Sequence, residues 1–162
     1  MQDEESGQAK NPNVGRIQEE WEAERDAVRA KLLRQIESAF DGVELGGGVS
    51  LHQARAMDDY ESPSEIAAAR TLDTESRWQD ISDEKLDRLS HTLAHMDAEG
   101  FRFHIPRFMT YALLNEGSGS FATFSPIYFT EKSRRSDTRT NLLSEDQRAA
   151  VEAFADFYSE GW

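Results

Sequence analysis

Apolar residues between Arg16 and Phe40 recur at about every fourth position and define one face of a helix. They are Ile17, Trp21, Val28, Leu32, Ile36 and Phe40, and the residues between them include many acids and arginines. A stripe with this period is typical of an amphipathic helix that buries one face and exposes the other. We therefore expect a long helix over residues 16–40. Residues 1–15 contain almost no apolar side chains and are predicted to form a disordered tail.

Capping patterns predict where three further helices begin. Ser50, Ser62 and Ser144 each stand three residues before a Gln or Glu, an arrangement that satisfies the first backbone N–H groups of a helix. We expect helices over residues 51–59 and 63–72, and a last helix after Ser144. The preceding glycine run, residues 46–48, lacks the pattern of a phosphate-binding loop and is expected to be a turn.

The middle of the chain combines two periods. Ser82 predicts the start of a helix that ends before Gly100, with a stripe formed by Leu86, Leu89, Leu93 and Met96. Between residues 101 and 105 aromatic or aliphatic residues alternate with polar ones, which predicts a short extended segment. Pro106 then predicts a helix over residues 106–116. This helix is apolar around most of its circumference, and we expect it to lie at the centre of the fold.

Residues 117–143 have the least regular pattern. The run from Phe121 to Phe129 is rich in aromatic residues, so we expect it to pack on the core, and residues 127–130 are the candidate for a strand. Taken together, the patterns predict one domain over residues 16–162. Its fold class is all-α or nearly so, a bundle of about six helices with a short extended segment near 101–105 and a candidate one at 127–130.

The composition of the chain excludes several classes of function. The chain of 162 residues has 31 acidic against 18 basic residues, a formal net charge of −13, and no cysteine. The absence of cysteine excludes a disulfide scaffold, a zinc ribbon and a cysteine nucleophile. No apolar run is long enough to cross a membrane, and the acidic start of the chain is unlike a signal peptide, so we expect a cytoplasmic protein. The acidity indicates a solubility or salt-adaptation trait, or a docking surface for a basic partner, and it argues against nucleic-acid binding.

His91 and His95 form the candidate metal site. If residues 82–99 are one helix, Asp87, His91 and His95 lie one turn apart on one face, where three ligands could converge. The alternative is that the two histidines are solvated, because their stripe lies opposite the leucines and lacks the Glu of a zinc-protease motif. The prediction for cofactors is none.

Acidic residues near a His and an Arg form the candidate catalytic group, Asp59, His104 and Arg107. A carboxylate and an imidazole could act as acid and base, and the guanidinium could hold an anion. The alternative is that an acid such as Asp59 caps a helix and pairs with a nearby Arg.

The basic tract between residues 132 and 139 is the candidate site for an anion or an acidic partner. It contains Lys132, Arg134, Arg135 and Arg139 within eight residues of an otherwise acidic chain. The alternative is a solvated loop whose cations pair with neighbouring acids.

Several short strings together resemble a known family. They are residues 39–43 (AFDGV), 49–54 (VSLHQA), 78–81 (WQDI) and 99–109 (EGFRFHIPRFM), followed by Leu143-Ser144 with Gln147. The set resembles a family of small bacterial proteins known only as a domain of unknown function, over residues of about 30–158. The family often has Tyr in the place of His104 and Ala in the place of Arg107, which argues against a shared chemistry there. The resemblance implies one domain and a bacterial cytoplasm, but no activity or ligand.

The sequence leads us to expect a non-catalytic domain that binds another protein, of the immunity or adaptor type, because no catalytic motif is present. The alternative is a small enzyme or ligand-binding protein that uses a pocket around Asp59, His104 and Arg107. Neither a membrane nor nucleic acid is expected as a partner. The oligomeric state stays open, and an exposed apolar face on the helix at 16–40 would indicate a homodimer.

Overall fold

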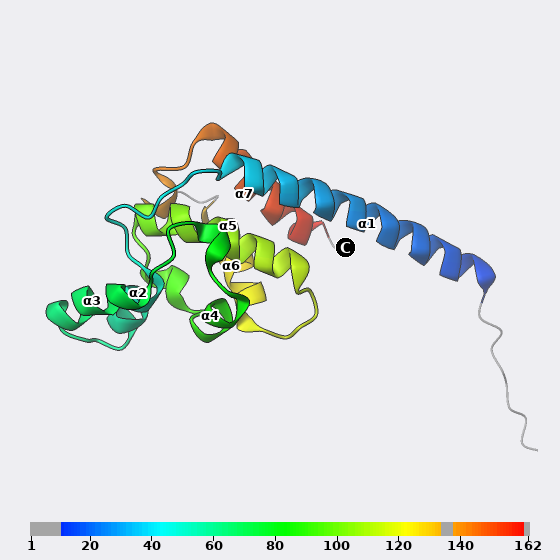
Figure 1. The fold of residues 1–162 in the computed structure, drawn as a ribbon. Helices are drawn as coiled ribbons and strands as arrows, with labels where there is room; N and C mark the ends of the chain where they lie inside the picture. The colour runs from blue at the N-terminus through cyan, green and yellow to red at the C-terminus, as the bar shows by residue number, and fades with distance from the viewer. Residues whose placement is uncertain (1–10, 134–137, 161–162) are drawn as a thin grey trace, which may run out of the picture.

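The computed structural model describes residues 11–133 and 138–160, without the side chains of residues 132 and 133. Within these residues it contains helices and no strands, so the expected all-α single domain is confirmed (Figure 1). The helices are α1 (Pro12–Ala39), α2 (Leu51–Asp58), α3 (Pro63–Ala69), α4 (Asp83–Arg88), α5 (Ala98–Leu114), α6 (Phe121–Ser133) and α7 (Glu145–Ser159). Four short 3₁₀ turns join them: η1 (Arg70–Leu72), η2 (Trp78–Asp80), η3 (Thr92–His95) and η4 (Thr138–Thr140).

The long first helix is confirmed, but it begins earlier than predicted. The Asn11 side chain accepts a hydrogen bond from the Asn13 N–H at 3.0 Å, and Pro12 occupies the first helical position, where its missing N–H is not needed. Residues 12–15, which were predicted to belong to the tail, are therefore helical. Residues 1–10 of the predicted tail lie outside the described part of the chain.

The capping patterns predicted three helix starts correctly. α2, α3 and α7 begin directly after Ser50, Ser62 and Ser144. Both hydrogen bonds of the capping box form at Ser62 and Ser144, and at Ser50 the backbone N–H donates to the Gln53 side chain. The predicted helix over residues 63–72 consists of α3 followed by η1. The glycine turn before α2 is held by the Arg70 guanidinium, which donates hydrogen bonds to the carbonyl oxygens of Gly46 and Gly48.

The predicted helix over residues 82–99 begins where expected, because Ser82 caps α4, but its predicted length was wrong. After Arg88 the chain forms the η3 turn and then enters α5 at Ala98, although the leucines of the stripe are buried as expected. Local hydrogen bonds compete with the helix: the Thr92 hydroxyl donates to the Leu89 carbonyl at 2.7 Å, and the Asp97 side chain accepts from the Gly100 N–H at 2.8 Å. Asp97 thereby caps α5, so Gly100 lies inside a helix and does not end one.

The extended segment predicted over residues 101–105 was also wrong, because α5 runs through it. Phe101, Phe103, His104 and Ile105 are all at most 2% exposed. In this segment His104 is buried along with the apolar residues, so a helix that packs into the core imitated the alternating period of a strand. The expectation of a central, buried helix is confirmed in α5, which begins before the proline and contains it.

The candidate strand at residues 127–130 belongs to α6, so that expectation was wrong as well. The aromatic run packs on the core only in part. Ala122 is buried and Ile127 and Phe129 are partly buried, whereas Phe121 and Phe124 are more than half exposed.

The core surrounds α5, which packs against α1 and α6, and α7 packs against those same two helices. Figure 1 shows α1 and α7 lying side by side on one side of α5, with α2 and α3 at the opposite end of the molecule from the N-terminal half of α1. The Trp78 Nε1–H donates a hydrogen bond to the Phe40 carbonyl at 3.0 Å and ties η2 to the end of α1. None of the helices described here is long and apolar enough to cross a membrane.

Candidate functional site

A pocket lies between α6, the η3 turn and the end of α2, and we call it the aromatic pocket. Its volume is about 680 Å³. It is lined by Asp58, His91, Ala94, His95, Phe121, Phe124, Ser125, Tyr128 and Phe129. Small-molecule sites in proteins have volumes of roughly 300–1,000 Å³, so this cavity has the size of a ligand site.

One face of α6 forms the aromatic wall. Phe121, Phe124 and Tyr128 follow one another at spacings of three and four residues, and this spacing brings them to one side of a helix. Their exposed fractions are 53%, 57% and 58%. Adjacent aromatic rings that stay this exposed are typical of a binding surface.

The polar groups of the aromatic pocket come from three elements. His95 Nε2 lies 3.0 Å from Asp58 Oδ1, and the His91 ring lies against the Phe121 ring with 4.5 Å between centroids. Ser125 is 3% exposed, and its hydroxyl has no hydrogen-bond partner among the residues described. A buried polar group without a partner is rare, because its loss of hydration is uncompensated, so a bound ligand is one explanation for it.

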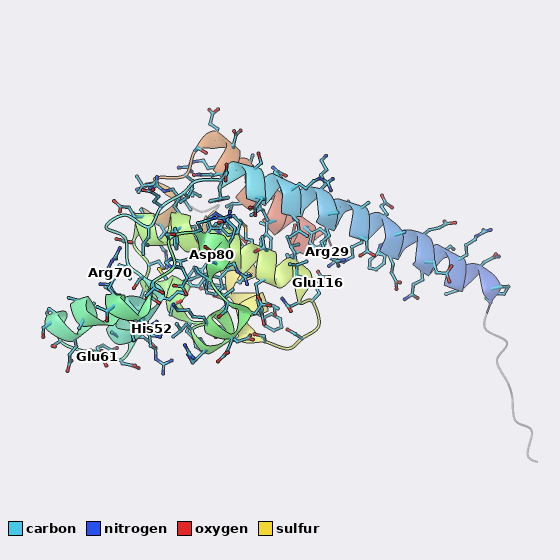
Figure 2. All side chains as sticks on the ribbon, in the orientation of Figure 1. Arg29, His52, Glu61, Arg70, Asp80 and Glu116 are labelled. Carbon is cyan, nitrogen blue, oxygen red and sulfur yellow. The ribbon has the colours of Figure 1, made fainter. Side chains whose placement is uncertain are left out.

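A second exposed surface is the N-terminal part of α1. In Figure 2, Arg29 of α1 lies beside Glu116, which follows α5, and the two side chains form an ion pair. N-terminal to this contact α1 extends beyond the rest of the fold, which we call the body. Arg25 also pairs with Glu116, and its guanidinium lies 4.2 Å from the centroid of the Phe157 ring. All residues from 12 to 24 are exposed, and we call this segment the α1 overhang.

The apolar stripe of α1 continues along the overhang. Ile17 and Trp21 are 61% and 40% exposed, and Val28 is 39% exposed. They share the helix face that carries the buried Leu32 and Ile36. Helix α1 therefore carries apolar residues along one face, interrupted at Glu24, and the body buries this face only in the C-terminal half.

A buried ion-pair network joins α2 to α4. Asp73 accepts from the His52 backbone N–H at 2.7 Å, its Oδ1 lies 2.7 Å from His52 Nδ1, and Lys85 Nζ is at 2.7 Å. Lys85 also contacts Glu75 at 2.8 Å. Burial raises the pKa of the Asp73 carboxyl, but hydrogen bonds from Lys85, Ser50 and His52 outweigh it and hold the pKa at about 2. The network anchors the start of α2, and no local sequence pattern predicted it.

The structure does not form the predicted metal face, because the chain leaves the helix after Arg88. Asp87 accepts hydrogen bonds from the Tyr111 hydroxyl at 2.6 Å and from the Ser120 hydroxyl, and these bonds lower the pKa of its carboxyl. His91 and His95 line the aromatic pocket, and Asp87 does not. In residues 11–133 and 138–160 no three potential ligands converge as a metal site.

The candidate catalytic residues have separate partners. Asp59 pairs with Arg55 at 3.1 Å on the surface, as the alternative interpretation expected. Arg107 donates to the Ile81 carbonyl at 2.8 Å and pairs with Asp83. His104 is 2% exposed, its Nδ1 lies 2.7 Å from the Gly100 carbonyl oxygen, and burial lowers its pKa to about 4. These contacts do not bring the three side chains together in one pocket.

Arg139 is the one cation of the basic tract whose side chain lies within the described residues. Arg139 Nη1 donates to the carbonyl oxygens of Leu93 and Ala94 at 3.3 and 3.2 Å, and its guanidinium carbon lies 5.0 Å from the centroid of the Phe129 ring. Arg139 thus binds the η3 turn and an aromatic ring of the pocket wall. Arg134, Arg135 and the side chain of Lys132 lie outside the described residues.

These features define a small all-α domain with a ligand-sized aromatic pocket and an exposed amphipathic helix. A family model matches residues 28–161, and the chain belongs to that family, a family of unknown function (DUF6714). No curated protein and no solved structure matches the chain. The match confirms the resemblance to a family of unknown function. It begins after the α1 overhang, so the overhang lies outside the part of the chain that the family model covers.

Proposed function

We propose that this protein is a non-catalytic protein-binding domain of the immunity or adaptor type. Its binding surface is the α1 overhang, and its partner presents a basic amphipathic helix. The observation that carries the proposal is that Val14 and Ile17 are 60% and 61% exposed on a helix segment, residues 12–24, in which every residue is exposed. The absence of cysteine from the chain is consistent with the proposed location in the bacterial cytoplasm.

The overhang has little to stabilise it in isolation. Helices shorter than roughly 12–15 residues are marginal in water unless a packed face supports them, and residues 12–24 are exposed all around. Because the exposed stripe lies in line with the buried Leu32 and Ile36, it presents the kind of face that elsewhere on α1 packs against other helices. A partner helix would provide this packing.

The charge of the α1 overhang indicates the kind of partner that it binds. The overhang contains Glu19, Glu20, Glu22 and Glu24 but only one base, Arg16, so its net charge is −3. A second copy of the chain would place this acidic segment against itself and would be repelled. A helix with Lys or Arg beside its apolar stripe would instead be attracted, and complementary charge speeds encounter as well as favouring the correct partner.

A defined peptide pair tests the proposal. One synthetic peptide is an amphipathic helix with leucines flanked by lysines, and the other has glutamates in place of the lysines. Fluorescence anisotropy is expected to detect binding of the lysine peptide only, with an affinity that falls as salt rises. Ile17→Asp should weaken binding about tenfold or more. The matched control is Leu72→Asp, which changes an exposed leucine at the other end of the molecule and should have no effect.

Two results would contradict the proposal. Equal binding of both peptides, or binding that survives Ile17→Asp, would show that the overhang does not recognise a basic helix. A concentration-dependent dimer in analytical ultracentrifugation that Ile17→Asp abolishes would show that the stripe serves a homodimer. The enzymatic alternative at Asp59, His104 and Arg107 gains no support from the separate contacts of these residues.

A further inference from the structure

The aromatic pocket combines features that point to a ligand of a particular class. We propose that it binds a small organic cation with an apolar body, such as an arylalkylamine. This site is separate from the α1 overhang and does not depend on the function proposed for it.

The wall of the pocket suits the apolar body of such a ligand. Phe121, Phe124 and Tyr128 lie on one helix face and keep more than half of their surface exposed. The ligand would cover these rings, and their removal from water favours binding. Aromatic ring faces also carry negative electrostatic potential, so they attract a cation within about 6 Å of the ring centroid.

The charged groups of the pocket also favour a cation. The Asp58 carboxylate contacts His95 Nε2 through Oδ1 at 3.0 Å, and half of the Asp58 side chain stays exposed. A neutral ligand would cover this charge without balancing it, and an anion would be repelled by it. An ammonium group would pair with it.

The same wall already holds a cation in the structure. The Arg139 guanidinium carbon lies 5.0 Å from the centroid of Phe129, one of the rings that line the pocket. This contact shows that a ring of the wall accepts a planar cation at cation–π distance. Arg139 is also held by the carbonyl oxygens of Leu93 and Ala94, so it is fixed at one edge of the pocket.

The buried hydroxyl of Ser125 supplies an independent observation. The residue lines the pocket, is 3% exposed, and its hydroxyl has no hydrogen-bond partner among the described residues. A hydroxyl can accept a hydrogen bond from an ammonium group or donate one to a polar ligand atom. A ligand amine would therefore satisfy a group whose burial is otherwise uncompensated.

The test compares two probes that differ in charge. The full chain is titrated with 2-phenylethylammonium and, separately, with 2-phenylethanol, and amide shifts are followed by NMR. We expect the ammonium probe to bind about tenfold more tightly, with the largest shifts at His91, His95 and Ser125. Asp58→Asn should abolish the preference for the ammonium probe. Tyr128→Ala should weaken both probes.

Controls separate this site from the overhang and from loss of fold. Leu72→Ala should leave both affinities unchanged, and the amide spectrum of each variant reports whether it is folded. Binding of the lysine peptide is expected to be the same in the wild type and in Tyr128→Ala, so either proposal can fail without the other. Equal affinity for both probes, shifts centred away from the pocket, or an unchanged preference in Asp58→Asn would overturn the proposed ligand class. An absence of shifts with both probes would overturn the site.

Discussion

The buried His104 predicts a specific loss of stability in acid. Its Nδ1 lies 2.7 Å from the Gly100 carbonyl oxygen, and since a carbonyl can only accept, Nδ1 carries a proton and donates it to this bond. Burial lowers the pKa of the imidazole from 6.5 to about 4, and the hydrogen bond to Gly100 opposes this change only in part.

The sign and size of the effect follow from proton binding. Between pH 6.5 and about 4 the unfolded chain binds a proton at this histidine and the folded chain does not, so stability falls as pH falls through this range. Each pH unit corresponds to about 1.4 kcal/mol for one proton. The wild-type protein should therefore lose about 3 kcal/mol of unfolding free energy from His104 alone between pH 7 and pH 4. Other groups add their own changes to this value.

His104→Leu isolates the contribution. Leucine has a similar size and cannot be protonated, so the variant should match the wild type at pH 7 to within about 1 kcal/mol. At pH 4 the variant should be more stable than the wild type by about 3 kcal/mol, because the other titrating groups are common to both proteins. Urea unfolding followed by circular dichroism at each pH measures the difference.

A core variant that does not titrate serves as the control. Phe103→Leu should lower the unfolding free energy by a similar amount at every pH. A difference between His104→Leu and the wild type that stays constant from pH 7 to pH 4 would refute the assignment of a buried, neutral imidazole. Direct NMR titration of the His104 ring, with an expected midpoint near 4, gives an independent check.

Two further predictions concern the substitution of single buried residues. Gly100→Ala should destabilise the protein by about 2 kcal/mol or more in urea unfolding, because the new Cβ would lie 2.6 Å from a backbone oxygen. The matched control Gly15→Ala meets no atom within 4 Å and should be neutral or stabilising by up to about 1 kcal/mol. Lys85→Met should cost about 3–5 kcal/mol at pH 7, because it leaves the Asp73 carboxylate buried without its cation. That cost should shrink in acid as Asp73 becomes protonated.

The opposite result in either experiment would contradict the structural contact on which that prediction rests. Equal effects of the two glycine substitutions would mean that α5 does not approach the chain closely at Gly100. A loss in Lys85→Met that is independent of pH would mean that Lys85 contributes by packing, since a charge effect on Asp73 must vary with the protonation of the carboxyl.

Local signals predicted the fold well where one side chain acts on neighbouring backbone. Ser50, Ser62 and Ser144 marked helix starts correctly because a cap acts within one turn, and the stripe from Leu32 to Ile36 predicted the buried face of α1. The failures lie where tertiary contacts override such signals. Residues 101–105 of α5 were predicted to be extended because apolar and polar residues alternate there, and residues 127–130 of α6 because the run around them is rich in aromatic residues.

The candidate sites were harder to predict than the fold. His91 and His95 were singled out as ligands, and the structure places both beside the aromatic pocket, which Asp87 does not line. Phe121, Phe124 and Tyr128 could have been recognised only if residues 121–133 had been assigned to a helix, because the wall depends on helical spacing. The contact between Asp73 and Lys85 joins residues on separate elements, and no spacing in the sequence encodes it.

The sequence by itself determined the helical class, the long amphipathic first helix, three helix starts and the acidic net charge. These properties depend on residue type and on short-range geometry, which act within a few turns of the chain. Only the tertiary structure decided which parts of each apolar face are covered. The body covers Leu32 and Ile36 but leaves Ile17 and Trp21 exposed, and α6 packs on the core while its aromatic face stays open. Burial depends on which distant segments come together, and for this reason the candidate binding surfaces became visible only in three dimensions.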